Sequence, residues 1–228
     1  MFGLDESIAS YSDGTSLVLV VLVAVLLGLR HATDPDHVAA VTTLVASSRE
    51  HATRHAASLG VAWGLGHAAT LFLFGLPILL FGAYLPERLQ QLAETGVAVL
   101  IVALAVRLLL RWHAGGLTVR SHLDAHGVRT AGSAFGIGLL HGMGGSAGVG
   151  ILIVASVEST ALAVLALGLL ALFTAVSMTV LTTGFGRALV SRPVSAAFGH
   201  VAPMLGVASL AFGVWYATAA WSLAPYPF

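Results

Sequence analysis

Two histidines and two carboxylates lie within seven residues of an otherwise apolar stretch: His31, Asp34, Asp36 and His37, directly after Arg30. Ionisable side chains at membrane depth are rare and usually functional, because each costs about 2.5 to 3.5 kcal/mol near the bilayer centre. A divalent cation would offset that cost, since imidazole suits zinc, copper, iron and nickel, and carboxylates balance the charge of the ion. The stretch therefore predicts a transition-metal site with His31, Asp36 and His37 as ligands. Asp34 is explained equally well as a further ligand or as the N-cap of a helix.

Two more histidines stand in glycine-rich surroundings further along the chain. His67 follows Gly64 and Gly66, and His141 opens a run of small residues that reaches Ser146. Glycine-rich faces let membrane helices approach closely, so one interpretation of both histidines is simple helix packing. The other makes His67 a third imidazole of the metal site and makes His141 part of the metal pathway, with Ser146 as a weak oxygen donor.

The composition is that of an integral membrane protein. Of the 228 residues, 57% are hydrophobic and 9% are charged, and the mean hydropathy is +0.94, against about 25% charged residues in an ordinary soluble domain. The absence of cysteine excludes disulfides, thiolate metal sites and thiol-exchange chemistry. Ten acidic residues balance ten basic ones, all of them arginine, so no basic surface predicts a nucleic-acid partner.

Six apolar runs are each long enough to cross a bilayer, which takes about 20 residues. They cover residues 17–46, 59–82, 89–110, 131–157, 161–185 and 201–221. We therefore expect an all-α, polytopic membrane protein with about six transmembrane helices in a single domain, residues 1–228. Pro35 should break the first run, because proline has no N–H to donate and its ring clashes with the preceding turn. We expect the hydroxyls of the fifth run to bond to their own helix; they belong to Thr174, Ser177, Thr179, Thr182 and Thr183.

The first and fourth runs share a pattern. Residues 28–31, Gly-Leu-Arg-His, are echoed by residues 138–141, Gly-Leu-Leu-His, and the five positions from the first histidine to Asp36 equal those from the second to Ser146. Pro35 interrupts one run and a glycine-rich segment interrupts the other. We therefore expect a 3+3 inverted repeat with interrupted helices one and four, the arrangement that places a transporter's site near the midplane.

Arginine placement predicts the orientation of the chain. Eight of the ten arginines fall near the connections after runs one, three and five; they are Arg49, Arg54, Arg107, Arg111, Arg120, Arg129, Arg187 and Arg192. The positive-inside rule puts these connections in the cytoplasm and both termini outside the cell (inner or plasma) membrane. Residues 1–16 then form an extracytoplasmic tail and residues 113–130 a cytoplasmic connection. The latter carries His113, His122 and His126, which fit a solvated loop or a weak metal-binding loop.

The spacing His31-x4-Asp36-His37 resembles the H-x4-D-H signature of the nickel/cobalt transporter (NicO) superfamily of membrane permeases. Residues 65–70, Leu-Gly-His-Ala-Ala-Thr, resemble that family's G-H-[ST] motif. Residues 140–147, Leu-His-Gly-Met-Gly-Gly-Ser-Ala, are similar to the H-G-[LM]-[AG]-G-S-A motif of its short, urease-accessory-type members. The resemblance implies that His67 joins the metal site and that nickel or cobalt is the transported ion.

We therefore expect a secondary permease for a divalent transition-metal cation, Ni2+ or Co2+, which binds at the transport site as substrate; no cofactor is expected. The metal ion and the lipid bilayer are its expected partners. An intramembrane metal-dependent enzyme is an alternative, although the chain has no H-E-x-x-H motif and no glutamate near His31, His67 or His141. An exporter of a different divalent metal and a bis-histidine haem protein are further alternatives.

Overall fold

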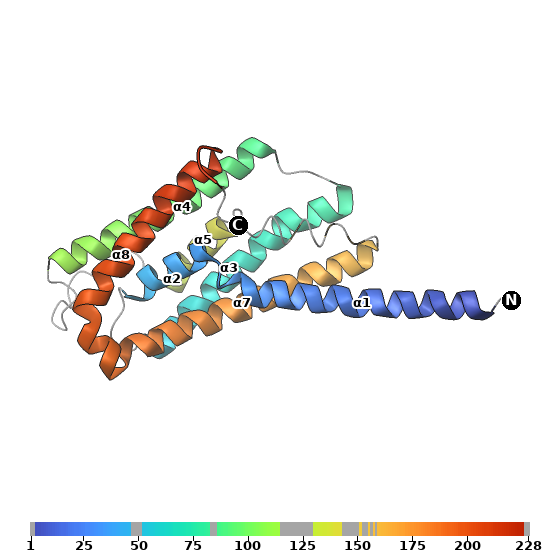
Figure 1. Ribbon diagram of the computed structural model, residues 1–228, viewed down its shortest axis with the longest axis horizontal. Coiled ribbons are helices and arrows are strands. Elements are labelled where there is room, and N and C mark those ends of the chain that lie inside the picture. Colours follow the sequence, from blue (N-terminus) through green and yellow to red (C-terminus); the bar gives the residue numbers. More distant parts are fainter. Residues whose placement is uncertain are drawn as a thin grey trace.

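The computed structural model describes residues 3–46, 52–82, 86–114, 130–142 and 159–225, together with residues 151, 155 and 157. Its helices are α1 Gly3–His31, α2 Pro35–Ala46, α3 Ala52–Phe81, α4 Glu87–His113, α5 Ala131–His141, α7 Thr160–Val190 and α8 Arg192–Ala220 (Figure 1). The part of the chain described in this way contains no strand. The prediction of an all-α protein is confirmed to that extent.

The first apolar run is broken where the sequence predicts. α1 ends at His31 and α2 begins at Pro35, and the two helices are bent by 43° at the break. Between them the Asp34 amide donates a hydrogen bond to the His31 carbonyl at 3.1 Å. Proline fits the first position of α2 because an amide there has no carbonyl partner within the helix.

Four helical segments are long and apolar enough to cross a membrane: Ala56–Phe81, Glu87–His113, Thr160–Ala188 and Gly199–Ala220. The bent pair Leu17–His31 and Pro35–Val41 makes a fifth when it is counted as one broken span. The predicted fourth span begins with α5, which has 11 residues, and then enters residues 143–150, outside the described part of the chain. The chain is a multi-pass membrane protein whose described residues account for five of the six expected spans.

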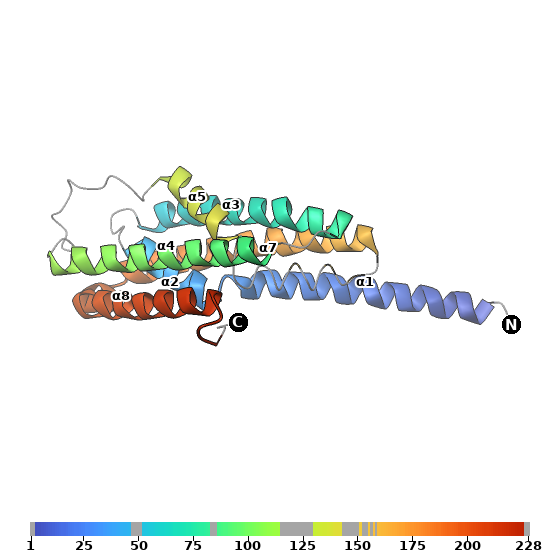
Figure 2. The same cartoon turned by 90° about the horizontal axis from the view of Figure 1, so that it is seen from above.

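The helices pack in pairs around the break in the first span (Figures 1 and 2). α3 packs most extensively against α7, α4 packs against α8, α5 lies on α3, and α1 lies on α7. The short α2 contacts α4, α7 and α8. Protein therefore surrounds the irregular backbone between α1 and α2, which is the condition under which such backbone is tolerated inside a membrane.

A glycine brings α1 against α7. A Cβ atom on Gly28 would lie 2.8 Å from the Leu170 carbonyl oxygen and 3.0 Å from the Thr174 amide nitrogen. Both of these neighbours are backbone atoms, so no side-chain movement could make room for a larger residue. Small residues are the usual means by which membrane helices reach this separation.

A second glycine brings α5 against α3 in the same manner. A Cβ atom on Gly138 would overlap the Trp63 carbonyl oxygen and would lie 2.9 Å from the His67 amide nitrogen. Thr70 adds a hydrogen bond between the two helices, since its hydroxyl lies 2.9 Å from the Leu139 carbonyl oxygen. The end of α5 is therefore held against the middle of α3.

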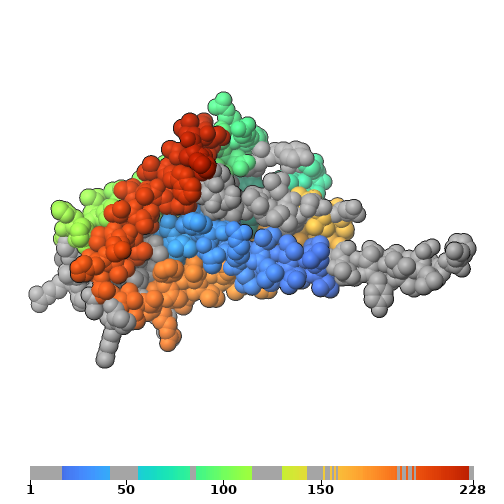
Figure 3. Space-filling model, viewed as in Figure 1, coloured from blue at the N-terminus to red at the C-terminus, as the bar shows by residue number. Residues whose placement is uncertain are grey.

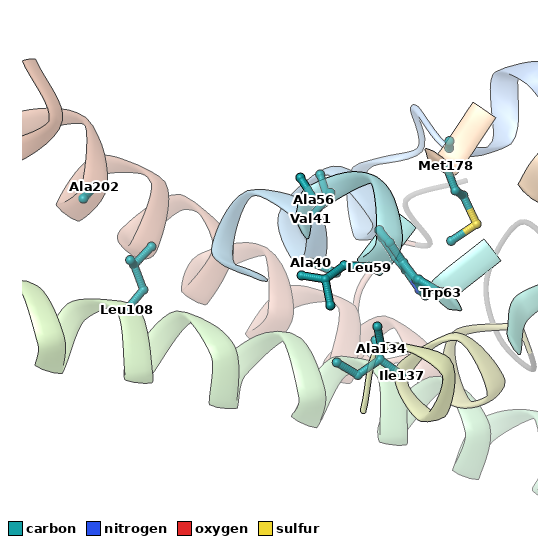
Figure 4. Packing of buried hydrophobic residues seen from close by; sticks show 11 residues of the cluster. Ala40, Val41, Ala56, Leu59, Trp63, Leu108, Ala134, Ile137, Met178 and Ala202 are labelled. Carbon is teal, nitrogen blue, oxygen red and sulfur yellow. The ribbon is translucent and has the colours of Figure 1, made fainter. Parts of the chain in front are cut away.

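The largest buried cluster lies where α2, α3, α5 and α7 meet, and it includes Val41, Leu59, Trp63, Ile137 and Met178 (Figure 4). The outward faces of the helices are apolar as well. On the face drawn in Figure 3, α1, α2, α7 and α8 reach the surface, and across the molecule many large apolar side chains are exposed. A surface of this kind suits a solvent of lipid tails.

Candidate metal centre

Four helices place the predicted ligands in one buried cluster. His31 is the last residue of α1, Asp36 and His37 lie in the first turn of α2, His67 lies midway along α3, and His141 is the last residue of α5. Asp36, His67 and His141 each have an exposed fraction of 0%, and those of His37 and His31 are 1% and 6%. Residues far apart in the sequence therefore meet away from solvent.

Within the cluster, two groups of three side chains could each hold one ion. The ligand atoms of His31, His37 and His67 all lie within 4.8 Å of one another, and so do those of Asp36, His37 and His141. His37 belongs to both groups. The centroid of its ring is 4.5 Å from that of His31 and 4.3 Å from that of His141.

The rings of His31 and His67 meet at their Nε2 atoms, which are 2.9 Å apart. The Nδ1 atom of His31 faces the Asp34 carboxylate at 3.4 Å. A carboxylate at one ring nitrogen fixes the tautomer and the orientation of the ring, and it leaves the other nitrogen for a metal ion. The Nε2 atom of His31 is therefore the one presented to the cluster.

Asp34 has contacts of both kinds that the sequence suggested. Its main-chain carbonyl accepts a hydrogen bond from the Val38 amide at 3.0 Å, as an N-cap carbonyl does. Its carboxylate faces His31 and also accepts a hydrogen bond from Arg30 at 3.0 Å. Because the carboxylate already meets these two side chains, its chemistry is that of a group that orients His31.

Asp36 joins two imidazoles of the cluster. One carboxylate oxygen lies 3.0 Å from Nδ1 of His37, and the other lies 3.0 Å from Nε2 of His141. A buried carboxylate is tolerated only when it is paired and hydrogen-bonded, because its desolvation is costly. These contacts tie the end of α5 to the start of α2, so that the two predicted helix interruptions meet at one carboxylate.

Three ring nitrogens of the cluster are buried and have no hydrogen-bond partner among the described residues: Nε2 of His37, Nδ1 of His67 and Nδ1 of His141. An unpaired buried polar group costs about 1 to 3 kcal/mol, so such groups are uncommon in native structures. A neutral imidazole nitrogen is also a good ligand for a transition-metal ion. The cluster is therefore short of partners in the way that an ion would correct.

Trp63 is a site residue that the sequence analysis did not single out. Its side chain is buried, and its ring lies 5.7 Å from that of His37 and 5.7 Å from that of His141. The available signal was its position four residues before His67, which puts both side chains on one face of α3. The indole supplies an apolar wall that keeps water from two of the imidazoles.

Two of the five hydroxyls of the fifth run do not bond to their own helix as predicted. Thr179, Thr182 and Thr183 each donate to the carbonyl four residues earlier, at 2.6 to 2.8 Å. The hydroxyls of Thr174 and Ser177 are buried and have no hydrogen-bond partner in the described part of the chain. The prediction is therefore wrong for Thr174 and Ser177 and confirmed for the other three.

The remaining candidates lie elsewhere. His113 is the exposed last residue of α4 and belongs to neither group of ligands. His122, His126 and Ser146 fall outside the described residues. The possibility of a metal-binding loop at residues 113–130 therefore stays a prediction, and so does the role of Ser146.

Comparison with known proteins gives a family and two relatives. The family described as "NicO: High-affinity nickel-transport protein" matches residues 17–122. Urease accessory protein UreH of Bacillus sp. (strain TB-90) is 30% identical over 155 residues, which cover 64% of this chain and 67% of that protein. A high-affinity nickel transport protein of Cupriavidus necator is 31% identical over 100 residues, which cover 44% of this chain and 28% of that protein. No solved structure matches the chain.

Proposed function

The chain belongs to the NicO family, and from that membership we propose that it carries a nickel ion across a membrane through its buried histidine cluster. The segment that matches the family contains four residues of the cluster, and they are His31, Asp36, His37 and His67. The printed names of the relatives describe a nickel transport protein and a urease accessory protein. These names favour transport over the intramembrane metalloenzyme.

The observation that carries the proposal is the 2.9 Å separation of the Nε2 atoms of His31 and His67. Two nitrogens bound to one ion at about 2.1 Å and at a right angle to each other are about 3 Å apart. Right angles between ligands are typical of tetragonal nickel sites. The pair is therefore spaced for neighbouring positions on one nickel ion. Cobalt, a neighbouring first-row ion, is proposed as the second substrate.

The two groups of ligands suit passage of an ion as well as its binding. Because His37 belongs to both groups, an ion held with His31 and His67 can exchange them for Asp36 and His141 without losing every imidazole. A permease must bind its ion firmly enough to replace water and weakly enough to release it. Replacing ligands one at a time lowers the barrier between the two positions.

We propose the six-span, 3+3 inverted repeat as the architecture around this site. α1 ends at His31 and α5 ends at His141, and these two helix ends meet at Asp36. Gly28 of α1 contacts Thr174, and Gly138 of α5 contacts His67. Thr174 follows His67 by 107 residues, so this shift along the chain converts one helix contact into the other.

The pairing of α3 with α7 supports the same repeat. A Cβ atom on Gly60 would lie 3.0 Å from Cβ of Thr182, and a Cβ atom on Gly75 would lie 2.9 Å from a methyl carbon of Leu167. Gly60 precedes Leu167 by 107 residues, and Gly75 precedes Thr182 by 107 residues. Each contact therefore becomes the other when the two helices are exchanged, as a pseudo-twofold axis between α3 and α7 requires.

The proposal includes an orientation in the cell membrane. With eight of ten arginines in alternate connections, the positive-inside rule places residues 113–130 in the cytoplasm and both termini outside. Cysteines introduced one at a time test this in a chain that has none. We expect an impermeant thiol reagent to label intact cells at positions 12 and 222 and to leave positions 48, 121 and 191 unlabelled. The opposite pattern would reverse the orientation.

The function is tested by the variant His37→Ala, which removes the residue common to both groups of ligands. Purified protein in lipid vesicles should show saturable nickel flux that this variant abolishes, while the protein still inserts and purifies normally. His113→Ala is the matched control, because it removes an exposed histidine at the end of α4. Nickel flux through His37→Ala at the unaltered rate would refute the proposed function.

A further inference from the structure

We propose that Thr174 and Ser177 form an oxygen-donor half-site on α7 for the transported ion, the counterpart of the His67 half-site on α3. This inference rests on the function proposed above and names a part of the pathway that the histidine cluster does not include. Residues 174–177, Thr-Ala-Val-Ser, follow residues 67–70, His-Ala-Ala-Thr, by the same 107 positions that relate the two helices. The repeated scaffold therefore carries an imidazole in one half and a hydroxyl in the other.

Two glycine contacts bring Thr174 next to the cluster. Its amide nitrogen would lie 3.0 Å from a Cβ atom on Gly28, one helical turn before His31. The next residue, Ala175, has its Cα atom 2.8 Å from the position of a Cβ atom on Gly64. Gly64 stands between Trp63, which packs on His37, and His67. Thr174 is thus enclosed by the two helices that carry the first group of ligands.

The hydroxyls themselves point to a missing partner. Thr174 is 0% exposed and Ser177 is 9% exposed, and neither hydroxyl has a hydrogen-bond partner among the described residues. Thr182 is equally buried on the same helix, but its hydroxyl donates to the Met178 carbonyl at 2.6 Å. The local helix bond is therefore available on α7 and is not made at these two positions. A cation that passes nearby would use the lone pairs.

The counterpart on α3 shows what Ser177 lacks. In that half, the Thr70 hydroxyl lies 2.9 Å from the Leu139 carbonyl and 3.2 Å from the Gly66 carbonyl, so Thr70 is occupied by backbone. Ser177 takes the equivalent place in the other half without such a contact. The second half therefore keeps its hydroxyls free at the place where the first half uses a hydroxyl to lock two helices together.

The chemistry of the two half-sites differs in strength. A neutral hydroxyl is a much weaker ligand for a first-row divalent ion than imidazole is. An ion that exchanges an imidazole ligand for Thr174 is held less tightly, which is the condition for leaving the site. The α7 half-site therefore provides release, whereas His31, His37 and His67 provide capture.

The test compares two threonine-to-valine variants in nickel-flux and nickel-binding measurements on the purified full-length protein. Thr174→Val removes an unpaired hydroxyl, so the melting temperature should not fall, yet we expect the turnover rate of nickel flux to drop about tenfold. Thr182→Val, the matched control, removes a hydroxyl of equal burial that is already bonded, and it should leave the turnover rate unchanged. Thr174→Ser keeps the hydroxyl and should keep the flux.

A third variant installs the ligand of the other half. Thr174→His should raise the affinity of the purified protein for nickel at least tenfold and should slow the release of nickel from preloaded vesicles. Unaltered flux through Thr174→Val, or an equal loss in Thr182→Val, would overturn the proposed half-site. Either result, together with the loss of flux in His37→Ala, would leave the transport function standing. Unaltered flux in His37→Ala would instead refute that function.

Discussion

α3 and α7 are alike in packing and different in chemistry. Both run as long apolar helices beneath the end of a shorter partner, and in both a glycine of that partner touches the backbone at the critical residue, His67 in α3 and Thr174 in α7. His67 belongs to a group of ligands, whereas Thr174 offers only a hydroxyl. The comparison teaches that a repeated scaffold can place two positions alike and still assign them different tasks.

The same asymmetry holds for the helix ends. α1 and α5 both finish with a histidine, His31 and His141. Directly beyond His31, α2 adds Asp36 and His37, which touch ligands from both halves. Among the described residues, Asp34 and Asp36 are the carboxylates that contact the cluster, and both come from the first half. Negative charge therefore favours the ion on that side of the site.

The largest expected effect comes from breaking the stronger half-site. His67→Ala should weaken nickel binding by about one to two orders of magnitude, the loss typical of a removed or misoriented ligand. His113→Ala should change it little, because His113 is exposed and lies outside both groups of ligands. Isothermal titration of nickel into the purified protein measures both. Equal, small changes would return His67 to a packing role.

Sequence reasoning could find the histidines and the break for one physical reason: both are local anomalies. Charged and imidazole side chains inside an apolar run need an explanation, and Pro35 cannot continue a helix whatever surrounds it. The long helices followed from apolar length alone, although α3 starts at residue 52 instead of 59 and α8 starts at residue 192 instead of 201. Their first turns continue into polar sequence that a hydropathy pattern does not count as membrane-spanning.

What could not be predicted depends on which helices meet. Trp63 resembles any aromatic residue of a membrane helix until α5 places His141 against it. Thr174 and Thr182 have the same local options, and only the packing of α1 and α3 against α7 distinguishes the unpaired hydroxyl from the bonded one. The 107-residue relation between α3 and α7 is likewise faint in sequence, since it preserves small and polar character more than identity.

A smaller effect should come from the glycines that make the two halves pack alike. Gly138→Ala and Gly28→Ala should each lower the free energy of unfolding by about 1 to 3 kcal/mol, because the added methyl group meets backbone atoms of the facing helix. Gly136→Ala, two residues before Gly138 on α5, has open space around it and should be neutral or slightly stabilising. Thermal unfolding in detergent measures the difference. A clearly milder effect at Gly28 would show that the two contacts are unequal.

The smallest expected effect concerns the third helix pair, α4 with α8, where a tryptophan at the C-terminal end of each helix donates to the other. Trp221 donates to the Thr95 hydroxyl at 3.0 Å, and Trp112 donates to the Gly199 carbonyl at 2.8 Å. These two acceptors are not equivalent. The residue four positions after Gly199 is Pro203, which has no N–H, so that carbonyl lacks its donor within the helix.

Trp112→Phe should therefore cost about 1 kcal/mol, the typical net value of one hydrogen bond, and Trp221→Phe should cost less because Thr95 keeps its bond to the Gln91 carbonyl. Pro203→Ala restores the missing N–H of α8, so in that background the Trp112→Phe substitution should lose most of its cost. A double-mutant cycle on the melting curves measures this coupling. If the two substitutions were strictly additive, the indole would not be compensating for the proline, and the two ends of the α4–α8 pair would be equivalent after all.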